Sequence, residues 1–158
     1  MKKQKGFSLI ELLIVVAIIL IIAAIAIPNL LKSRMAANEA SAVGTLRTLN
    51  TANVTYSAQC PAVGFPATLV DLGPSAAGGC TGGANIVDNI LGVAAPVKSG
   101  YNFAYAAAAA GGLNTTYTIA ASPVTAGTTG QRFFFTDQTG VIRYGLTGAA
   151  TAASSALQ

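Results

Sequence analysis

The sequence predicts an α+β chain in which one long N-terminal helix, with a transmembrane half and an amphipathic half, packs on a small antiparallel β-sheet. Three observations support this prediction. A long apolar run follows a basic N-terminal segment, a three- and four-residue spacing of apolar residues continues after it, and a two-residue alternation appears in the last third of the 158 residues. Because these patterns follow one another along the chain, we expect the helix first and the sheet second.

The apolar run extends from Phe7 to Ile27 and contains one acidic residue, Glu11. At a rise of 1.5 Å per residue, a helix of this length measures roughly 30 Å, which is about the thickness of bilayer hydrocarbon. Three lysines precede the run, at positions 2, 3 and 5. The positive-inside bias therefore predicts a single-pass membrane protein with a cytoplasmic N-terminus and an exported remainder.

Helical spacing continues beyond the apolar run. Pro28 is expected to kink or locally melt the helix, because proline removes one backbone hydrogen bond. After it, apolar residues recur at three- and four-residue steps, at Leu31, Met35, Ala42, Leu46 and Leu49. We predict one helix from about Phe7 to Ala58, with a membrane-spanning part over residues 7–28 and an amphipathic part over residues 29–58. Gly44 weakens this helix by about 1 kcal/mol relative to alanine.

Residues 59–100 are rich in glycine, proline and alanine and are expected to form a connecting loop with short helical turns near residues 67–72 and 86–91. The chain's two cysteines, Cys60 and Cys80, lie in this exported region. An even cysteine count in an oxidising compartment predicts one disulfide, which closes a loop of about 20 residues and stabilises the fold by about 3 kcal/mol. Two buried free thiols are the alternative.

The sheet is expected over residues 101–145. Tyr101, Phe103 and Tyr105 alternate with small or polar residues, and the pattern returns at Tyr117 and Ile119 after a segment expected to be flexible, residues 106–112. Residues 132–136 and 141–144 flank a turn-forming Asp-Gln-Thr-Gly sequence and predict a hairpin. Three or four antiparallel strands follow from these patterns, and residues 146–158 are expected to form a flexible tail.

The composition argues against an enzyme. The chain has no histidine, which excludes histidine-based triads and histidine metal sites. The segment from Gly92 to Ser99 has the wrong spacing for a phosphate-binding loop, and the aspartates at 71, 88 and 137 are scattered. We therefore expect no catalytic residue, no cofactor and no metal. Asn53 and Asn114 each begin a glycosylation acceptor triplet, a pattern with many false positives.

The net charge of +4 does not indicate a nucleic-acid partner. Residues 1–6 carry three of the nine basic residues, so residues 7–158 have six basic against five acidic residues, a net charge of +1. Sequence-independent binding of nucleic acid depends on a basic patch, and no such patch remains once the first six residues are removed.

The order of residues around Gly6 is the most specific motif. Gly6-Phe7-Ser8-Leu9-Ile10-Glu11, followed by the apolar run, resembles the class III leader of type IV pilins and their pseudopilin relatives. The resemblance is dense over about residues 5–58 and general beyond them. It implies a type IV pilin-like fold, a leader peptide over residues 1–6, and cleavage after Gly6 by a prepilin peptidase that then methylates Phe7.

The same resemblance implies a function and partners. The chain would be an inner-membrane precursor that becomes the structural subunit of an extracellular type IV pilus, a homo-oligomeric helical filament. A platform protein and an ATPase would assemble it. Many type IV pilins have a C-terminal disulfide that brackets a surface loop, whereas Cys60 and Cys80 lie between the predicted helix and sheet, so we assign no receptor-binding loop. The resemblance leaves open whether the fibre serves adhesion, twitching motility, DNA uptake, secretion or electron transfer.

Glu11 is the informative residue of the motif. A carboxylate within the bilayer costs on the order of 3 kcal/mol and needs a compensating partner. One explanation is a capping box formed by Ser8 and Glu11 at the helix start. The other is assembly, in which the Phe7 amine of an incoming subunit meets Glu11 of a neighbour. We assign assembly roles to Phe7, Glu11 and Pro28.

Several alternatives remain at this point. Ala24-Ile25-Ala26 is an A-x-A triplet, so a conventional signal peptidase could cut after Ala26. A plain single-span anchor would make the chain a membrane-anchored binding module that does not polymerise. Within the pilin class, a pseudopilin of a type II secretion system and a minor pilin share the leader and the helix.

Overall fold

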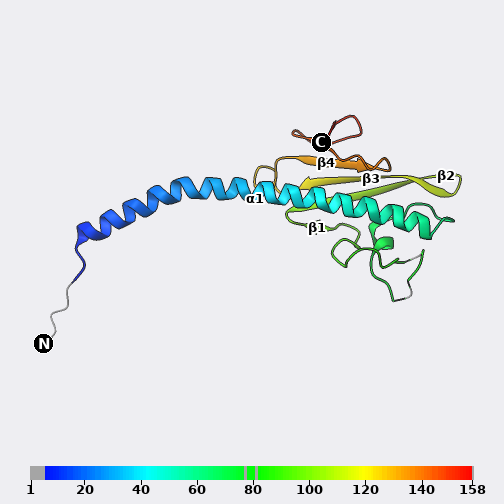
Figure 1. Cartoon of the computed structure of the whole chain (residues 1–158), viewed down its shortest axis with the longest axis horizontal. Helices are drawn as coiled ribbons and strands as arrows, with labels where there is room; N and C mark the ends of the chain where they lie inside the picture. The colour runs from blue at the N-terminus through cyan, green and yellow to red at the C-terminus, as the bar shows by residue number, and fades with distance from the viewer. Residues whose placement is uncertain (1–5, 77, 81, 158) are drawn as a thin grey trace. The chain divides into compact units, whose positions relative to one another are not determined.

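The computed structural model describes residues 6–76, 78–80 and 82–157. The lysines of the predicted leader lie outside the described residues. Its elements are α1 (Leu9–Gln59), the 3-10 helix η1 (Leu69–Leu72), and the strands β1 (Val97–Lys98), β2 (Tyr101–Ala110), β3 (Leu113–Pro123), β4 (Phe133–Asp137), β5 (Arg143–Gly145) and β6 (Ser155–Ala156) (Figure 1). The chain divides into two compact units, Met1–Arg34 and Met35–Gln158, which we describe separately.

The predicted α+β class is confirmed: one long N-terminal helix and an antiparallel sheet. Helix α1 begins two residues after the predicted start and ends one residue after the predicted end. Pro28 lies inside it, and the helix continues through this residue. A proline within a helix leaves the carbonyl four residues earlier, that of Ala24, without its backbone donor.

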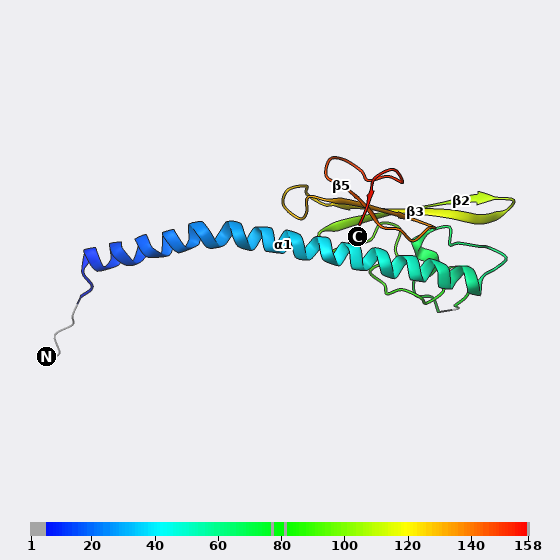
Figure 2. The same ribbon diagram turned by 45° about the horizontal axis from the view of Figure 1, so that its top comes forward.

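Figure 2, a view turned by 45°, shows the strands of the second unit from another side. All neighbouring strands are antiparallel and follow one another in sequence order, from β1 to β6. The predicted hairpin is present as β4 and β5, with Phe134 opposite Tyr144. The turn between them is closed by a hydrogen bond from the Gly140 N–H to the Asp137 carbonyl, 2.9 Å.

The sheet is larger than the sequence patterns indicated. The alanines at 106–110, expected to be flexible, continue β2 and pair with β3, with one irregularity between Ala108 and Ala109. Gly111 and Gly112 then close a tight turn with positive φ at both positions, a conformation that glycine adopts without strain. The last residues also join the sheet, since β6 pairs with β5 and the Leu157 N–H donates to the Ile142 carbonyl.

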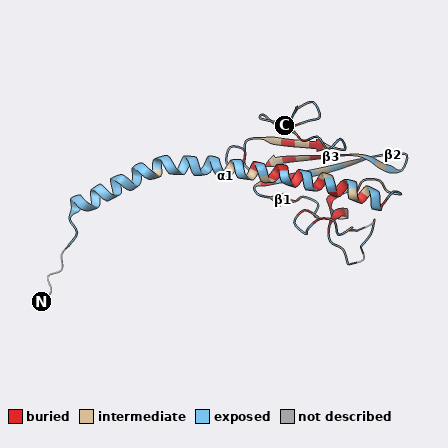
Figure 3. Ribbon diagram, viewed as in Figure 1, coloured by how far each residue is buried: buried red, intermediate tan, exposed pale blue. Residues whose placement is uncertain are grey.

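The core of the second unit lies between the sheet and the part of α1 that belongs to this unit (Figure 3). Fully buried side chains from α1 meet fully buried side chains from the sheet; the largest are Tyr56, Leu46 and Leu49 from α1 and Tyr101, Tyr117, Ile119 and Phe134 from the strands. The amphipathic spacing therefore faces the sheet at Ala42, Leu46 and Leu49, as predicted, whereas Leu31 is exposed in the first unit.

The connecting region is held by the predicted disulfide. Cys60 and Cys80 are bonded, with Cα atoms 5.6 Å apart, so the free-thiol alternative is wrong. The Tyr56 hydroxyl donates a hydrogen bond to the Cys80 carbonyl beside it. Gly73 and Gly92 allow two backbone segments to approach closely, because a Cβ on Gly73 would lie 2.8 Å from the Gly92 oxygen. Of the two predicted helical turns, the first appears as η1.

Candidate functional site

The predicted cleavage position lies outside the helix. Gly6, Phe7 and Ser8 precede α1 and are exposed, and the side chain of Phe7 is 77% exposed. The first backbone bond of the helix runs from the Leu12 N–H to the Ser8 carbonyl, 3.1 Å. The Gly6–Phe7 peptide bond therefore lies in an exposed, non-helical segment of its unit.

Glu11 lies in the first turn of α1 and is exposed. Among the described residues, neither Ser8 nor Glu11 makes a side-chain hydrogen bond, and the one ion pair involves other groups. The capping-box explanation for Glu11 is therefore not supported by the geometry. The carboxylate is still favoured by the positive end of the helix dipole.

The apolar run of the first unit is exposed. Between Phe7 and Leu31, each large apolar side chain is at least 45% exposed, with Val16 the least and Leu9 the most exposed at 79%. Figure 3 shows this part of α1 exposed along its length. One face carries a shallow groove of about 370 Å³, lined at helical spacing by Leu9, Leu12, Leu13, Val16, Ala17 and Leu20.

A helix with this surface needs an apolar environment. Its most apolar window has a mean hydropathy of 3.3 and is long and apolar enough to cross a membrane. Because apolar residues surround the whole circumference, the helix can be buried in lipid or among other helices of the same kind. The arrangement supports membrane anchoring and helix–helix association, and it does not suggest a reaction.

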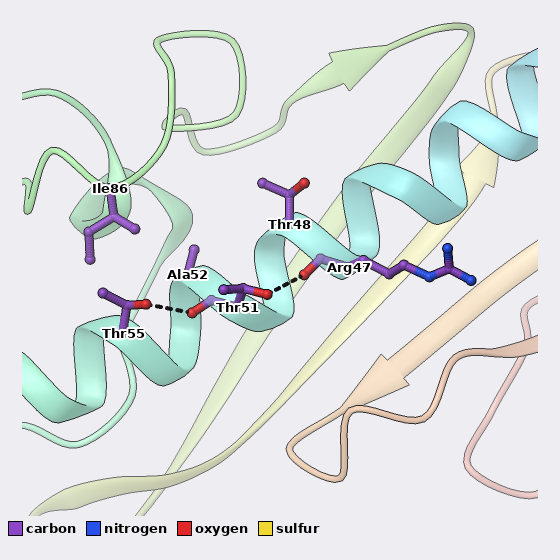
Figure 4. Close-up of a pocket in the computed structure, with 6 residues that line it drawn as sticks. All are labelled: Arg47, Thr48, Thr51, Ala52, Thr55 and Ile86. Carbon is purple, nitrogen blue, oxygen red and sulfur yellow. Dashed lines mark hydrogen bonds between the residues drawn. The ribbon is translucent and has the colours of Figure 1, made fainter.

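One surface groove of the second unit has no carboxylate, histidine or cysteine among its lining residues. It is lined by Arg47, Thr48, Thr51, Ala52, Thr55 and Ile86 (Figure 4). The threonine hydroxyls donate to carbonyls of their own helix, as Thr51 does to Arg47 at 3.0 Å and Thr55 to Thr51 at 2.9 Å. Within the part of the chain that the structure describes, no three His, Cys, Asp or Glu residues are grouped to hold a metal ion.

Among the described residues of the second unit, Glu39 is the buried charged residue, and the sequence analysis did not single it out. One carboxylate oxygen, Oε1, accepts from the backbone N–H groups of Gln131 and Arg132, and the other, Oε2, accepts from Arg132 Nε at 2.7 Å. The Arg132 guanidinium also lies 5.5 Å from the Phe134 ring centre. Burial raises the pKa of Glu39, but these hydrogen bonds and the positive charge of Arg132 outweigh it, so the pKa is lowered.

The asparagine side chains of both glycosylation triplets make hydrogen bonds within the folded protein. Asn53 is fully buried; its Nδ2 donates to the Leu49 carbonyl at 2.7 Å, and its Oδ1 accepts from the Tyr105 hydroxyl at 2.8 Å. Asn114 Nδ2 donates to the Phe65 carbonyl at 2.8 Å. Neither amide nitrogen is available to carry a glycan in the folded protein, which argues against both triplets as acceptor sites.

Comparison with known proteins identifies the N-terminal segment. Residues 1–27 match the family model described as the prokaryotic N-terminal methylation motif. Over 39 residues the chain is 64% identical to the type IV wide pilus major component PilA4 of Thermus thermophilus, covering 25% of this chain and 30% of that protein. Over 54 residues it is 48% identical to the type IV major pilin protein PilA of Myxococcus xanthus, covering 34% of this chain and 24% of that protein. No solved structure matches the chain.

The predicted resemblance is therefore confirmed: the chain carries a prepilin-type methylation motif and is homologous to type IV pilins in the matched segments. These segments span less than a third of the length of either relative.

Proposed function

We propose that this chain is the structural subunit of a type IV pilus. In this proposal a prepilin peptidase cuts after Gly6 and methylates the new N-terminus at Phe7, and the processed chain polymerises through its N-terminal helix. The names of the two relatives support a pilin in particular, because one is a major component of a wide type IV pilus and the other a major type IV pilin.

The observation that carries the proposal is the exposed apolar surface of α1 from Phe7 to Leu31. Moving one large apolar side chain out of water is worth about 1.5–3 kcal/mol, and more than a dozen are exposed here. Lipid provides one apolar environment for them. A bundle of identical helices provides the other, and head-to-tail contacts that do not close into a ring build an open filament.

In this proposal, Glu11 makes the contact between neighbouring subunits specific. Cleavage after Gly6 leaves a positively charged amine on Phe7, and Glu11 is the one acidic residue of the apolar run. An amine from an incoming subunit that meets Glu11 of its neighbour neutralises both charges in an apolar setting, where their attraction is stronger than in water. The missing hydrogen bond at Pro28 makes this part of the helix the easiest to adjust during packing.

Location and partners follow from the same proposal. The precursor is a single-pass inner-membrane protein with its N-terminus in the cytoplasm, and residues 35–158 lie outside. Bilayer lipid covers the helix before assembly, and a platform protein and an ATPase drive extraction into the filament. The Cys60–Cys80 disulfide is consistent with an oxidising compartment for the second unit.

The test is the N-terminus of the mature chain together with electron microscopy of sheared cell-surface material. We expect tandem mass spectrometry to find an N-methylated Phe7 terminus in long fibres. A chain that begins at Ile27 would refute the proposal. An intact Met1 terminus confined to membranes would indicate the anchored binding module, and a methylated Phe7 terminus confined to the envelope would indicate a pseudopilin.

A further inference from the structure

Lys32 and Arg34 are two exposed basic residues that follow the apolar run of the first unit. Among the described residues neither takes part in an ion pair, since the one ion pair joins Arg132 to Glu39. The sequence offers no acid close to them, because no aspartate or glutamate occurs between Glu11 and Glu39. Both positive charges therefore lack a counter-charge in this part of the chain.

The position of these charges along α1 matches the headgroup layer of a bilayer. Bilayer hydrocarbon is about 30 Å thick, and at 1.5 Å per residue about 20 residues of helix cross it. A span that begins near Phe7 therefore leaves the hydrocarbon near Ile27. The headgroups add about 5–7 Å on each side, which is roughly three to five more residues of helix and ends at about Lys32.

Helix geometry directs both side chains toward that layer. In an α-helix the Cα–Cβ bonds tilt toward the N-terminus, which for these two residues is the direction of the apolar run. The long stems of lysine and arginine cover apolar surface while their charged ends stay in a polar environment. The ammonium of Lys32 and the guanidinium of Arg34 can therefore reach the depth of the lipid phosphates.

The spacing of the two residues favours lipid over a protein partner. Successive helical residues are about 100° apart, so residues 32 and 34 lie about 200° apart around the helix and point to different sides. A protein that docks on one face would meet one of the two charges, whereas lipid surrounds a single span on every side. The large apolar side chains before them are likewise exposed. Lipid phosphates complement both charges.

We propose that Lys32 and Arg34 bind the phosphate groups of anionic phospholipids in the leaflet on the exported side. This inference rests on the proposed function, in which the unassembled chain lies in the inner membrane with residues 35–158 outside. Cleavage after Gly6 removes the three lysines that precede the apolar run, so these two residues are the basic residues that flank the span in the mature chain. They hold the processed helix at a fixed depth, and anionic lipid stabilises it there more than neutral lipid does.

Photocrosslinking in vesicles tests this inference. The full chain is reconstituted in phosphatidylcholine vesicles with increasing fractions of phosphatidylglycerol that carries a photoreactive headgroup, and crosslinks to residues 28–36 are mapped by tandem mass spectrometry. We expect Lys32→Gln and Arg34→Gln each to lower the affinity for the anionic lipid about fivefold, and the double variant to lower it roughly 25-fold. Arg34→Lys keeps the charge and should stay near the wild-type value.

Arg47→Gln is the matched control for the loss of one positive charge. Arg47 is an exposed residue of the same helix, about 20 Å further along α1 than Arg34, which is more than twice the screening length at physiological salt. Crosslinking to residues 28–36 should therefore stay at the wild-type level. The leader lysines are present in every variant, so their contribution cancels. Added sodium chloride should weaken the wild-type signal, because the attraction is electrostatic.

Four results would overturn the inference. Equal crosslinking of wild type and the double variant would show that the two residues do not bind lipid, and an equal loss in Arg47→Gln would assign the effect to overall charge. Displacement by inorganic phosphate at constant ionic strength would assign the site to free anions. Unchanged crosslinking together with fewer filaments in the double variant would assign both residues to a contact between subunits. All four leave the proposed function intact, whereas a wild-type chain that does not insert into vesicles would overturn both.

Discussion

Glu39→Gln is the substitution whose effect follows most directly from the structure. Glu39 is 7% exposed and connects α1 to the segment before β4, because its carboxylate accepts the backbone N–H groups of Gln131 and Arg132 and the Nε–H of Arg132. Glutamine has nearly the same volume but replaces one acceptor oxygen with an NH2 group. That group would face a donor, and the Arg132 charge would lose its partner.

The loss of folding stability caused by Glu39→Gln can be bounded. A hydrogen bond to a charged group contributes about 1.5–3 kcal/mol, and removing one partner of a fully buried ion pair costs about 3–5 kcal/mol. The side chain of Arg132 is 37% exposed, so water compensates part of the loss. We expect unfolding of the second unit to become easier by about 2 kcal/mol, which corresponds to a fall of about 8 °C in Tm for a domain of this size.

The pH dependence gives an independent check. The pKa of Glu39 is lowered from its ordinary value of 4.5 in the folded state. A carboxylate with a lowered pKa stabilises the fold fully above its unfolded pKa, and this contribution is lost as the pH falls through the folded value. The difference between wild type and Glu39→Gln should therefore be largest at neutral pH and shrink as the pH falls below 4.5.

Urea unfolding of the full chain in detergent, followed by the near-UV circular dichroism of the five tyrosines, measures both effects. Asp88→Asn is the control, because Asp88 is exposed and bonds to backbone N–H groups of its own turn. An unchanged midpoint for Glu39→Gln at pH 7, or a difference that persists unchanged in acid, would refute the reasoning.

Four further predictions follow. Glu11→Ala should leave membrane insertion and cleavage intact but reduce filament yield; a wild-type yield of sheared fibres would remove the assembly role of Glu11. Cys60→Ser should lower the stability of the second unit by about 3 kcal/mol in urea, with reduced wild type as the matched comparison, and an unchanged midpoint in both would contradict the loop-closure argument. Gly44→Ala should raise stability by up to about 1 kcal/mol, because a Cβ there meets nothing within 4 Å, and a loss of stability would show a contact not foreseen. Burial raises the pKa of Tyr101 and Tyr117 to about 12, so their neutral forms stabilise the fold below pH 10 and this contribution is lost as the pH rises toward 12. Absorbance titration of the phenols should show delayed, cooperative ionisation with unfolding, and an independent titration of all five tyrosines near pH 10 would argue against burial.

Much of the fold could be predicted because the local periodicity of apolar residues in the sequence indicates it. The order of helix, disulfide-bonded connection and sheet, and the β4–β5 hairpin, follow from spacings of three to four and of two residues. The continuation of β2 through residues 106–110 could not be predicted in this way, since alanine has a low strand preference. That segment is a strand because Tyr117 and Thr116 of β3 pair with it. Strand β6 has two residues and carries no pattern that a sequence could reveal.

The candidate functional residues also divide into those that a local sequence pattern predicts and those that it does not. The cleavage and methylation motif is contiguous, so Gly6, Phe7 and Glu11 could be identified from sequence order, and their roles remain proposals. The Glu39–Arg132 pair joins residues 93 positions apart, and it depends on where the segment before β4 meets α1.

The exposed apolar surface of the first unit restricts the environments in which a free chain can exist. Bringing its apolar side chains into water would cost on the order of tens of kcal/mol, far more than the stability of an ordinary folded domain. An aqueous pool of free chains is therefore negligible, and an apolar environment such as a bilayer has to hold them. In the proposed pilus, growth or shrinkage would exchange subunits directly with the membrane at its base, so the supply of subunits would depend on how many copies the membrane holds.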